Sequence, residues 1–144
     1  MKPFERFFPR AIMAPDNLAG TSGSHPWTDV GGARGYLWVV LAGSTDATGM
    51  VLRAQQATTV GGTGAKDIPG KVVTVADAGL DYRAYTISLL PGEMDTANGY
   101  RFARLRVEVT GGTTVSVATV FLGTEGRFGS MADERPPEVF PPVN

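Results

Sequence analysis

Hydrophobic and polar residues alternate along much of the middle of the chain. The clearest example is segment 101–109, in which every second residue is apolar and most of the residues between them are charged. The apolar positions are Ala103, Leu105, Val107 and Val109, and the charged positions include Arg104, Arg106 and Glu108. A period of two predicts a β-strand with one buried and one solvated face. Because Thr110, Gly111 and Gly112 follow, we expect a turn there and a hairpin with segment 113–122.

Similar short segments, rich in β-branched and aromatic residues and bounded by turn residues, recur along the chain. They predict strands at 36–42, 50–57, 71–76, 83–90, 101–109 and 113–122. The first segment has no polar side, so we expect a central strand that is covered on both faces or whose outer face meets a partner. No segment has the apolar stripe of a helix. The predicted fold class is all-β, a single antiparallel β-sandwich or jelly roll.

The prolines gather towards the two ends of the chain, and only Pro69 and Pro91 lie in its middle. Proline cannot donate a backbone hydrogen bond to a sheet. We therefore expect an extended N-terminal arm over residues 1–34, a sandwich core over 35–126 and a Pro-rich C-terminal arm over 127–144. Both arms carry large apolar residues, which are rare in disordered tails, so we expect them to pack on the core or on a neighbouring subunit.

Composition and charge exclude several classes of function. The chain has 144 residues, of which 42% are hydrophobic, and this is enough for one core. Its 13 basic and 14 acidic residues nearly cancel, so we expect neither a nucleic acid partner nor a membrane partner. The absence of cysteine excludes disulfides and thiolate chemistry. The first ten residues lack the apolar stretch of a signal peptide, and the longest apolar run, 36–42, is far shorter than a membrane span.

Few residues could carry chemistry. A Ser-His-Asp set could be drawn from Ser24, His25 and Asp29, but neighbours on an extended segment do not converge as a relay, and we expect His25 to pack or to cap. The loop at 61–66 lacks the Gly-Lys-Ser/Thr ending of a phosphate-binding loop. The acidic residues that could gather around a cation match no calcium loop; they are Asp77, Asp81, Glu93 and Asp95. We expect no catalytic residue, cofactor or metal, and a chain that is not an enzyme.

Two parts of the chain resemble small virion proteins of tailed bacteriophages. One is RFARLRVEVTGGTTVSV at 101–117, with LG at 122–123 and GRFG at 126–129. The other is QQAT at 55–58 followed by GTGAKDI at 62–68. The chain is most similar to head decoration proteins, also called cement proteins. This resemblance implies a virion structural protein on the capsid surface, assembled in the host cytoplasm, which stabilises the head by bridging subunits of the major capsid protein. It also implies self-association, most often as a homotrimer.

In such a protein we expect the interface to be formed by aromatic anchors of the arms and by arginines on one strand face. The candidates are Phe4, Phe7, Phe8, Trp27, Arg104, Arg106 and Phe140. The arginines could equally lie on a solvated outer face. Two other functions stay open at this point. One is a neck or tail adaptor, or another tail-associated β module; the other is a carbohydrate-binding β-sandwich that stacks sugar rings on Tyr82 and Tyr85.

Overall fold

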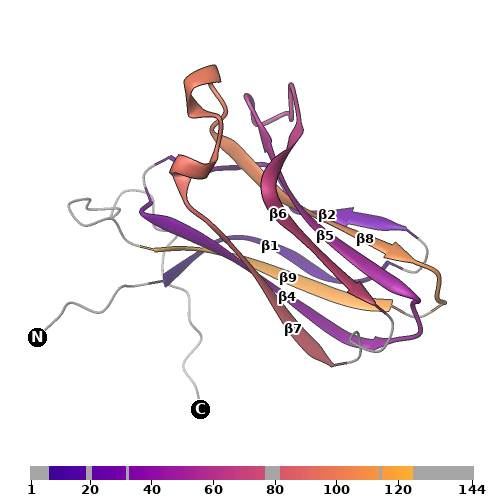
Figure 1. The fold of residues 1–144 in the computed structure, drawn as a ribbon. Helices are drawn as coiled ribbons and strands as arrows, with labels where there is room; N and C mark the ends of the chain where they lie inside the picture. The colour runs from indigo at the N-terminus through magenta and orange to yellow at the C-terminus, as the bar shows by residue number, and fades with distance from the viewer. Residues whose placement is uncertain (1–6, 19–20, 32, 77–81, 114, 125–144) are drawn as a thin grey trace, which may run out of the picture.

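The structure, a computed structural model, describes residues 7–18, 21–31, 33–76, 82–113 and 115–124 (Figure 1). The strands are β1 (Phe7–Asn17), β2 (Ser22–Ser24), β3 (Thr28–Asp29), β4 (Gly35–Thr45), β5 (Gly49–Ala57), β6 (Lys66–Ala76), β7 (Arg83–Leu89), β8 (Phe102–Thr110) and β9 (Val115–Thr124). Two short 3-10 turns, η2 (Pro91–Glu93) and η3 (Thr96–Asn98), lie between β7 and β8. Within these residues there is no helix long and apolar enough to cross a membrane. All six predicted strands are present.

The strands form two antiparallel sheets that pack face to face (Figure 1). Sheet A has the order β1-β9-β4-β7, and sheet B has the order β2-β8-β5-β6 with β3 also paired to β8. The pairs are nested along the chain: β5 pairs with β6, β4 with β7, β2 and β3 with β8, and β1 with β9. A long hairpin rolled up in this way is a jelly roll. The predicted fold class is therefore confirmed.

The predicted hairpin between segments 101–109 and 113–122 is wrong. β8 pairs with β5 in sheet B, whereas β9 pairs with β1 and β4 in sheet A, so the chain crosses from one sheet to the other after Thr110. Both strands bury every second side chain, as predicted, but they bury them against each other's sheet. Gly111 and Gly112 have φ of 72° and 84°, which favours glycine and makes this tight crossing possible.

The predicted N-terminal arm over 1–34 is also wrong for the residues that the structure describes. β1 pairs with β9 along almost its whole length, and β2 and β3 pair with β8. Pro9 and Pro15 fit because β1 is an edge strand, and its register shifts between Pro9 and Ala11 and between Met13 and Asp16. The predicted C-terminal arm, 127–144, lies outside the described residues.

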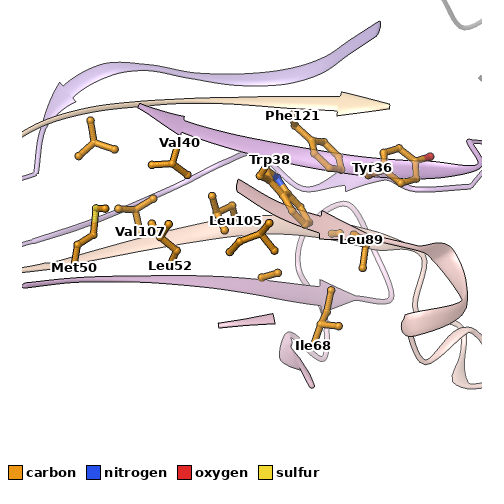
Figure 2. Close-up of a cluster of buried hydrophobic side chains, with 14 of the residues drawn as sticks. Tyr36, Trp38, Val40, Met50, Leu52, Ile68, Leu89, Leu105, Val107 and Phe121 are labelled. Atoms are coloured by element: carbon orange, nitrogen blue, oxygen red, sulfur yellow. The ribbon is translucent and has the colours of Figure 1, made fainter. Parts of the chain in front are cut away.

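The core lies between the sheets and is formed by the inward positions of both (Figure 2). Trp38 of β4 is fully buried and stacks on Phe121 of β9, with ring centroids 4.4 Å apart. Tyr36 also stacks on Phe121, with ring centroids 5.1 Å apart. Sheet B contributes smaller aliphatic side chains, among them Leu52 and Leu105. The large rings of sheet A therefore pack against branched residues of sheet B, which fixes the two sheets relative to each other.

Candidate functional site

The outer face of sheet A is uncharged across three neighbouring strands, and its central residues are apolar on two of them, β4 and β9. On β4 the outward residues Leu37, Val39 and Leu41 form the middle row, because Tyr36, Trp38 and Val40 point into the core. The register places Leu122, Val120 and Ala118 of β9 beside them on one side and Ser88, Thr86 and Ala84 of β7 on the other. None of these nine positions is charged. We call this surface the outer face of sheet A.

Large side chains on this face are open to solvent. Leu41 is 48% exposed, and Ile12 of β1, which lies opposite Val120, is 63% exposed. A shallow hollow of about 220 Å³ lies next to Leu41, between the ends of β4 and β9. The residues between them, such as Val39 and Val120, are half-buried. A continuous, partly exposed apolar surface is characteristic of interaction sites. The sequence predicted that segment 36–42 would be a central strand, and the structure confirms this, because β4 lies between β9 and β7.

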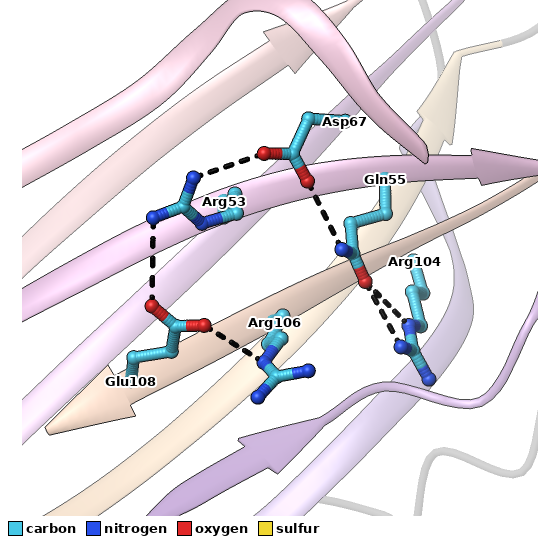
Figure 3. Close-up of polar contacts among 6 residues, drawn as sticks. All are labelled: Arg53, Gln55, Asp67, Arg104, Arg106 and Glu108. Carbon is cyan, nitrogen blue, oxygen red and sulfur yellow. Dashed lines mark hydrogen bonds and ion pairs between the residues drawn. The ribbon is translucent and has the colours of Figure 1, made fainter. Parts of the chain in front are cut away.

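The outer face of sheet B has the opposite character, because a chain of polar contacts crosses it (Figure 3). Arg53 of β5 donates to Asp67 of β6 at 2.9 Å and lies 3.5 Å from Glu108 of β8. Gln55 donates to Asp67 at 3.0 Å, and Arg106 pairs with Glu108 at 2.9 Å. The hydrogen bonds from Gln55 and Arg53 hold the pKa of the Asp67 carboxyl below its ordinary value. This face is solvated and its charges are paired within the chain.

Two of the predicted interface residues, Arg104 and Trp27, meet on this polar side. Arg104 donates through Nε and Nη2 to Oε1 of Gln55, at 3.0 and 2.9 Å, and its guanidinium lies 4.4 Å from the centre of the Trp27 ring. Trp27 is half-buried beneath the loop between β5 and β6, directly under Gly62. Arg104 and Arg106 therefore have partners in their own sheet. An intersubunit role for Trp27, Arg104 and Arg106 stays a prediction.

The other predicted interface residues are less fully described. Phe7 and Phe8 belong to β1, where their backbones pair with Thr124 and Gly123 of β9. Phe4 and Phe140 lie outside the described residues. The structure thus brings Phe7 and Phe8 to an edge of sheet A, while Trp27 and the two arginines lie in sheet B or beside it.

His25 lies in the interior between the two sheets and is only 2% exposed. Its backbone amide donates to the carbonyl of Leu105, and its Nε2 contacts the Oγ1 of Thr119. Burial lowers the pKa of His25 to about 4, because the charged imidazolium loses its hydration. Ser24 is exposed, and Asp29 pairs with Arg101. The expected packing histidine is therefore what the structure contains, although it packs in the core rather than on an arm.

The acidic residues between β7 and β8 bind lysines. Glu93 lies 2.8 Å from Lys71, and Asp95 lies 2.6 Å from Lys66. Asp95 also accepts from Asn98, and its backbone amide donates to the buried Gln56. Among the described residues no cluster of three or more His, Cys, Asp or Glu side chains could hold a metal ion. Asp77 and Asp81 lie outside that part of the chain.

No family model and no curated protein matches the sequence. Among solved structures, one described as "CBM4 structure and function" is 11% identical, with a TM-score of 0.47, over 84% of this chain and 78% of that one. A second, the crystal structure of FlhE, is 14% identical, with a TM-score of 0.36, over 85% of this chain and 98% of that one. Both TM-scores are below 0.5, so these likenesses support neither a family nor a function.

The tyrosines suggested as a sugar platform do not share one face. Tyr82 is 79% exposed and precedes β7 with φ of 51°. Tyr85 lies on the inward side of β7 and packs against the core. Flat stacking of a sugar needs rings presented together to solvent. The outer face of sheet A has instead large apolar side chains exposed to solvent. Its sequence signal is the absence of polar positions in 36–42 and the apolar residues on both sides of β9.

Proposed function

We propose that this chain is a non-enzymatic structural subunit that binds another protein within a larger assembly, through the outer face of sheet A. The observation that carries the proposal is the uncharged surface formed by the outward positions of β4, β9 and β7, extended by Ile12 of β1. Protein partners recognise such a surface mainly by burying it. The paired charges on sheet B favour contact with water.

Burial of this face would contribute to docking. Complete burial of one fully exposed large aliphatic side chain contributes about 1.5–3 kcal/mol. Because Leu41 is 48% and Ile12 63% exposed, covering both supplies about 2–3 kcal/mol before the cost of association. Sheet-on-sheet packing, about 10 Å apart, would also cover Leu37, Val39 and Val120. The core of the interface therefore needs no arm, although arms could add area around it.

The setting that we propose is the head of a tailed bacteriophage, with the chain as a capsid decoration protein on the major capsid protein. The resemblance of 101–117 and 55–68 to small virion proteins supports this setting. A decoration protein adds contact area across joints between shell subunits, repeated over many copies, and each ordinary interface buries about 1,200–2,000 Å². The same kind of surface would serve a neck or tail adaptor, which differs in copy number.

The absence of catalysis is part of the proposal. Catalysis requires a nucleophile, a base and an orienting group that converge at a surface open to substrate. His25 is buried against Thr119, whereas Ser24 is exposed and Asp29 is paired with Arg101. These contacts support a histidine with a packing role.

The decisive experiment is binding of the recombinant chain to phage heads assembled without it. We expect saturable binding with a copy number comparable with that of the major capsid protein, measured by quantitative mass spectrometry of the washed particles. Ile12→Glu and Leu41→Glu should each weaken binding by about 10-fold or more, because each places a charge in the buried face. Val60→Glu is the matched control, because Val60 is 67% exposed in the loop between β5 and β6.

Each other outcome has a clear meaning. A few copies per particle would move the protein to the neck or tail. Failure of the wild-type chain to bind heads or tails would overturn the virion role. Equal loss of binding by Val60→Glu and Leu41→Glu would show that the outer face of sheet A is not the docking surface.

A further inference from the structure

In the part of the chain that the structure describes, β7 is a sheet edge with little of the usual protection against strand pairing. It lies at the end of sheet A, and its seven residues pair with β4 in an unbroken register. It contains no proline, and its outward residues are Ala84, Thr86 and Ser88. Natural edge strands are normally blunted by proline, bulges, charges or short length, because an open edge is a template for another strand.

The other edges formed by the described residues carry such protection. β1 contains Pro9 and Pro15 and has two register shifts. β6 contains Pro69, and its pairing with β5 breaks between Arg53 and Gln55. β2 and β3 have three and two residues. Among the described strands, three edges are therefore protected against pairing, whereas β7 has neither a proline nor a register shift.

The register shows which backbone groups of β7 face this edge. The amide of Tyr82 donates to the carbonyl of Gly43, so Tyr82 and Gly43 form a hydrogen-bonded pair. Hydrogen-bonded pairs alternate in antiparallel sheets, so Ala84, Thr86 and Ser88 bond to β4. The amide and carbonyl groups of the intervening positions, such as Arg83 and Ile87, point away from β4 towards the open edge.

We propose that a second copy of this chain pairs with β7 through its own β7, in antiparallel orientation about a two-fold axis at Thr86. The amide and carbonyl groups that point towards the open edge belong to the odd-numbered residues of β7. They can bond across the contact only in registers that place odd-numbered residues of the two copies opposite each other. Among these, the register centred on Thr86 aligns all seven residues. It joins the two copies of sheet A into one continuous sheet of eight strands.

The sequence of β7 is self-complementary in this register. Thr86 lies opposite Thr86 of the second copy, and Tyr85 lies opposite Ile87 of the second copy. Thr–Thr pairs and pairs of an aromatic with a β-branched residue are among the favourable cross-strand neighbours. The single charged residue, Arg83, faces Leu89 of the second copy rather than another arginine. No like charges meet along the strand.

The described residues also leave space beside this edge. A groove of about 180 Å³ lies between β7 and β6, lined by residues 70–73 and 86–88. The inward side chains of an added strand would face this groove. A two-fold contact closes at two copies, so the inference favours a dimer over the homotrimer that the phage resemblance implies. It does not depend on what binds the outer face of sheet A.

The test is the oligomeric state of the purified full chain, measured by analytical ultracentrifugation at concentrations up to about 1 mM. We expect a reversible species with twice the 15.2 kDa mass of one chain. Thr86→Lys and Thr86→Glu should each raise the dissociation constant by about tenfold or more, since each sets like charges opposite one another at the axis. An equimolar mixture of the two variants at low salt should restore the dimer. Thr74→Lys, an exposed position on β6, is the control.

Circular dichroism and thermal melting of each variant establish that the monomer is folded, and Ser88→Lys provides a second probe if Thr86→Lys does not fold. A wild-type chain that stays monomeric, a trimer, or a dimer unaffected by both Thr86 variants would overturn the inference. So would a mixture that remains monomeric when each variant alone is folded. Because Ile12→Glu lies at the far edge of sheet A, loss of particle binding in that variant with an intact dimer would separate this inference from the proposed function.

Discussion

Asp46 holds Thr113 with both oxygens of its carboxylate. Oδ1 accepts the backbone amide of Thr113 at 2.8 Å, and Oδ2 accepts its hydroxyl at 2.6 Å. Asp46 lies in the connection from β4 to β5, and Thr113 lies in the connection from β8 to β9. Next to this contact, Thr48 donates through both its amide and its hydroxyl to the carbonyl of Thr110. Hydrogen bonds therefore join the two connections, β4 to β5 and β8 to β9, through which the chain passes from one sheet to the other.

We expect Asp46→Ala to lower the free energy of unfolding by about 1–3 kcal/mol, because it removes two hydrogen bonds to a charged acceptor. Asp46→Asn should recover part of this loss, since its amide oxygen can still accept from the Thr113 amide. Urea denaturation of the three proteins measures the difference. Equal transition midpoints for Asp46→Ala and the wild type would mean that the contact contributes nothing to stability.

His25 predicts a pH dependence of stability in a defined window. Its pKa is about 4 in the folded chain and about 6.5 when solvated. Below pH 6.5 the unfolded chain therefore binds a proton that the folded chain does not, and stability falls as the pH drops from 6.5 towards 4. The full difference is on the order of 3 kcal/mol. Below pH 4 both states are protonated, and this contribution stays constant.

The variant His25→Gln tests this assignment because it cannot titrate in that window. We expect its free energy of unfolding to change much less between pH 7 and pH 4.5 than that of the wild type. The carboxyls of Asp67 and Asp95 interfere little there, because a carboxyl whose folded-state pKa is lowered affects stability only as the pH falls through its unfolded value of 3.8, which lies below this window. Glu93, with an unfolded pKa of 4.5, contributes only at the lower edge of the window. An identical pH profile for both proteins would rule out His25 as the titrating group.

The strands could be predicted from the sequence because alternation is a local property. The alternating residues of 101–109 lie on β8 with the predicted faces inward and outward. The apolar run at 36–42 likewise predicted a strand whose outer face carries no polar residue, which is what β4 presents with Leu37, Val39 and Leu41. Alternation does not say which strand is the neighbour, however. The alternation in β8 and β9 fits two arrangements equally well: the strands could pair in one sheet, or they could face each other across the core from two sheets. Only the tertiary structure shows that the second arrangement is adopted.

The candidate site could not be predicted in the same way, because it is formed by residues that are distant in sequence. Pro9 and Pro15 suggested a segment outside the sheet, but an edge strand tolerates proline where its amide faces solvent. The half-buried ring of Trp27 lies against Gly62 of the loop between β5 and β6, a contact that segment 1–34 alone does not indicate, and its intersubunit role stays a prediction. The sheet A surface combines strands from four parts of the chain, and this combination cannot be read from any one segment.

The contact of Trp27 with Gly62 gives a further prediction. A Cβ at Gly62 would lie 2.4 Å from Nε1 of Trp27, and the residue has φ of 86°. Gly62→Ala therefore adds a clash to backbone strain, whereas Gly99→Ala, with φ of 81° and open space around it, adds strain alone. We expect Gly62→Ala to be less stable than Gly99→Ala by about 1–3 kcal/mol. Its tryptophan fluorescence should also shift as Trp27 moves, and equal stability and spectra would contradict this packing.

Truncation of the N-terminus tests whether β1 is part of the folded domain. Removal of residues 1–6 leaves the whole of β1, so we expect melting at the temperature of the full chain. Removal of residues 1–13 deletes most of the pairing with β9 and the inward residues Ala11 and Met13, which pack against the core.

Loss of a fully buried methionine costs about 2–5 kcal/mol, and this truncation removes the partly buried Met13 together with most of the pairing of β1 with β9. The longer truncation should therefore lower the melting temperature by roughly 10 °C or more, or prevent folding. Differential scanning calorimetry of the full chain and the two truncated chains measures this directly. If the chain that lacks residues 1–13 melted like the full chain, residues 7–13 would be an arm that the domain does not need, and their aromatic side chains would be available to a neighbouring subunit. A large loss confined to the longer truncation would instead show that Phe7 and Phe8 belong to the first strand of the jelly roll, where pairing with the last strand closes the sheet.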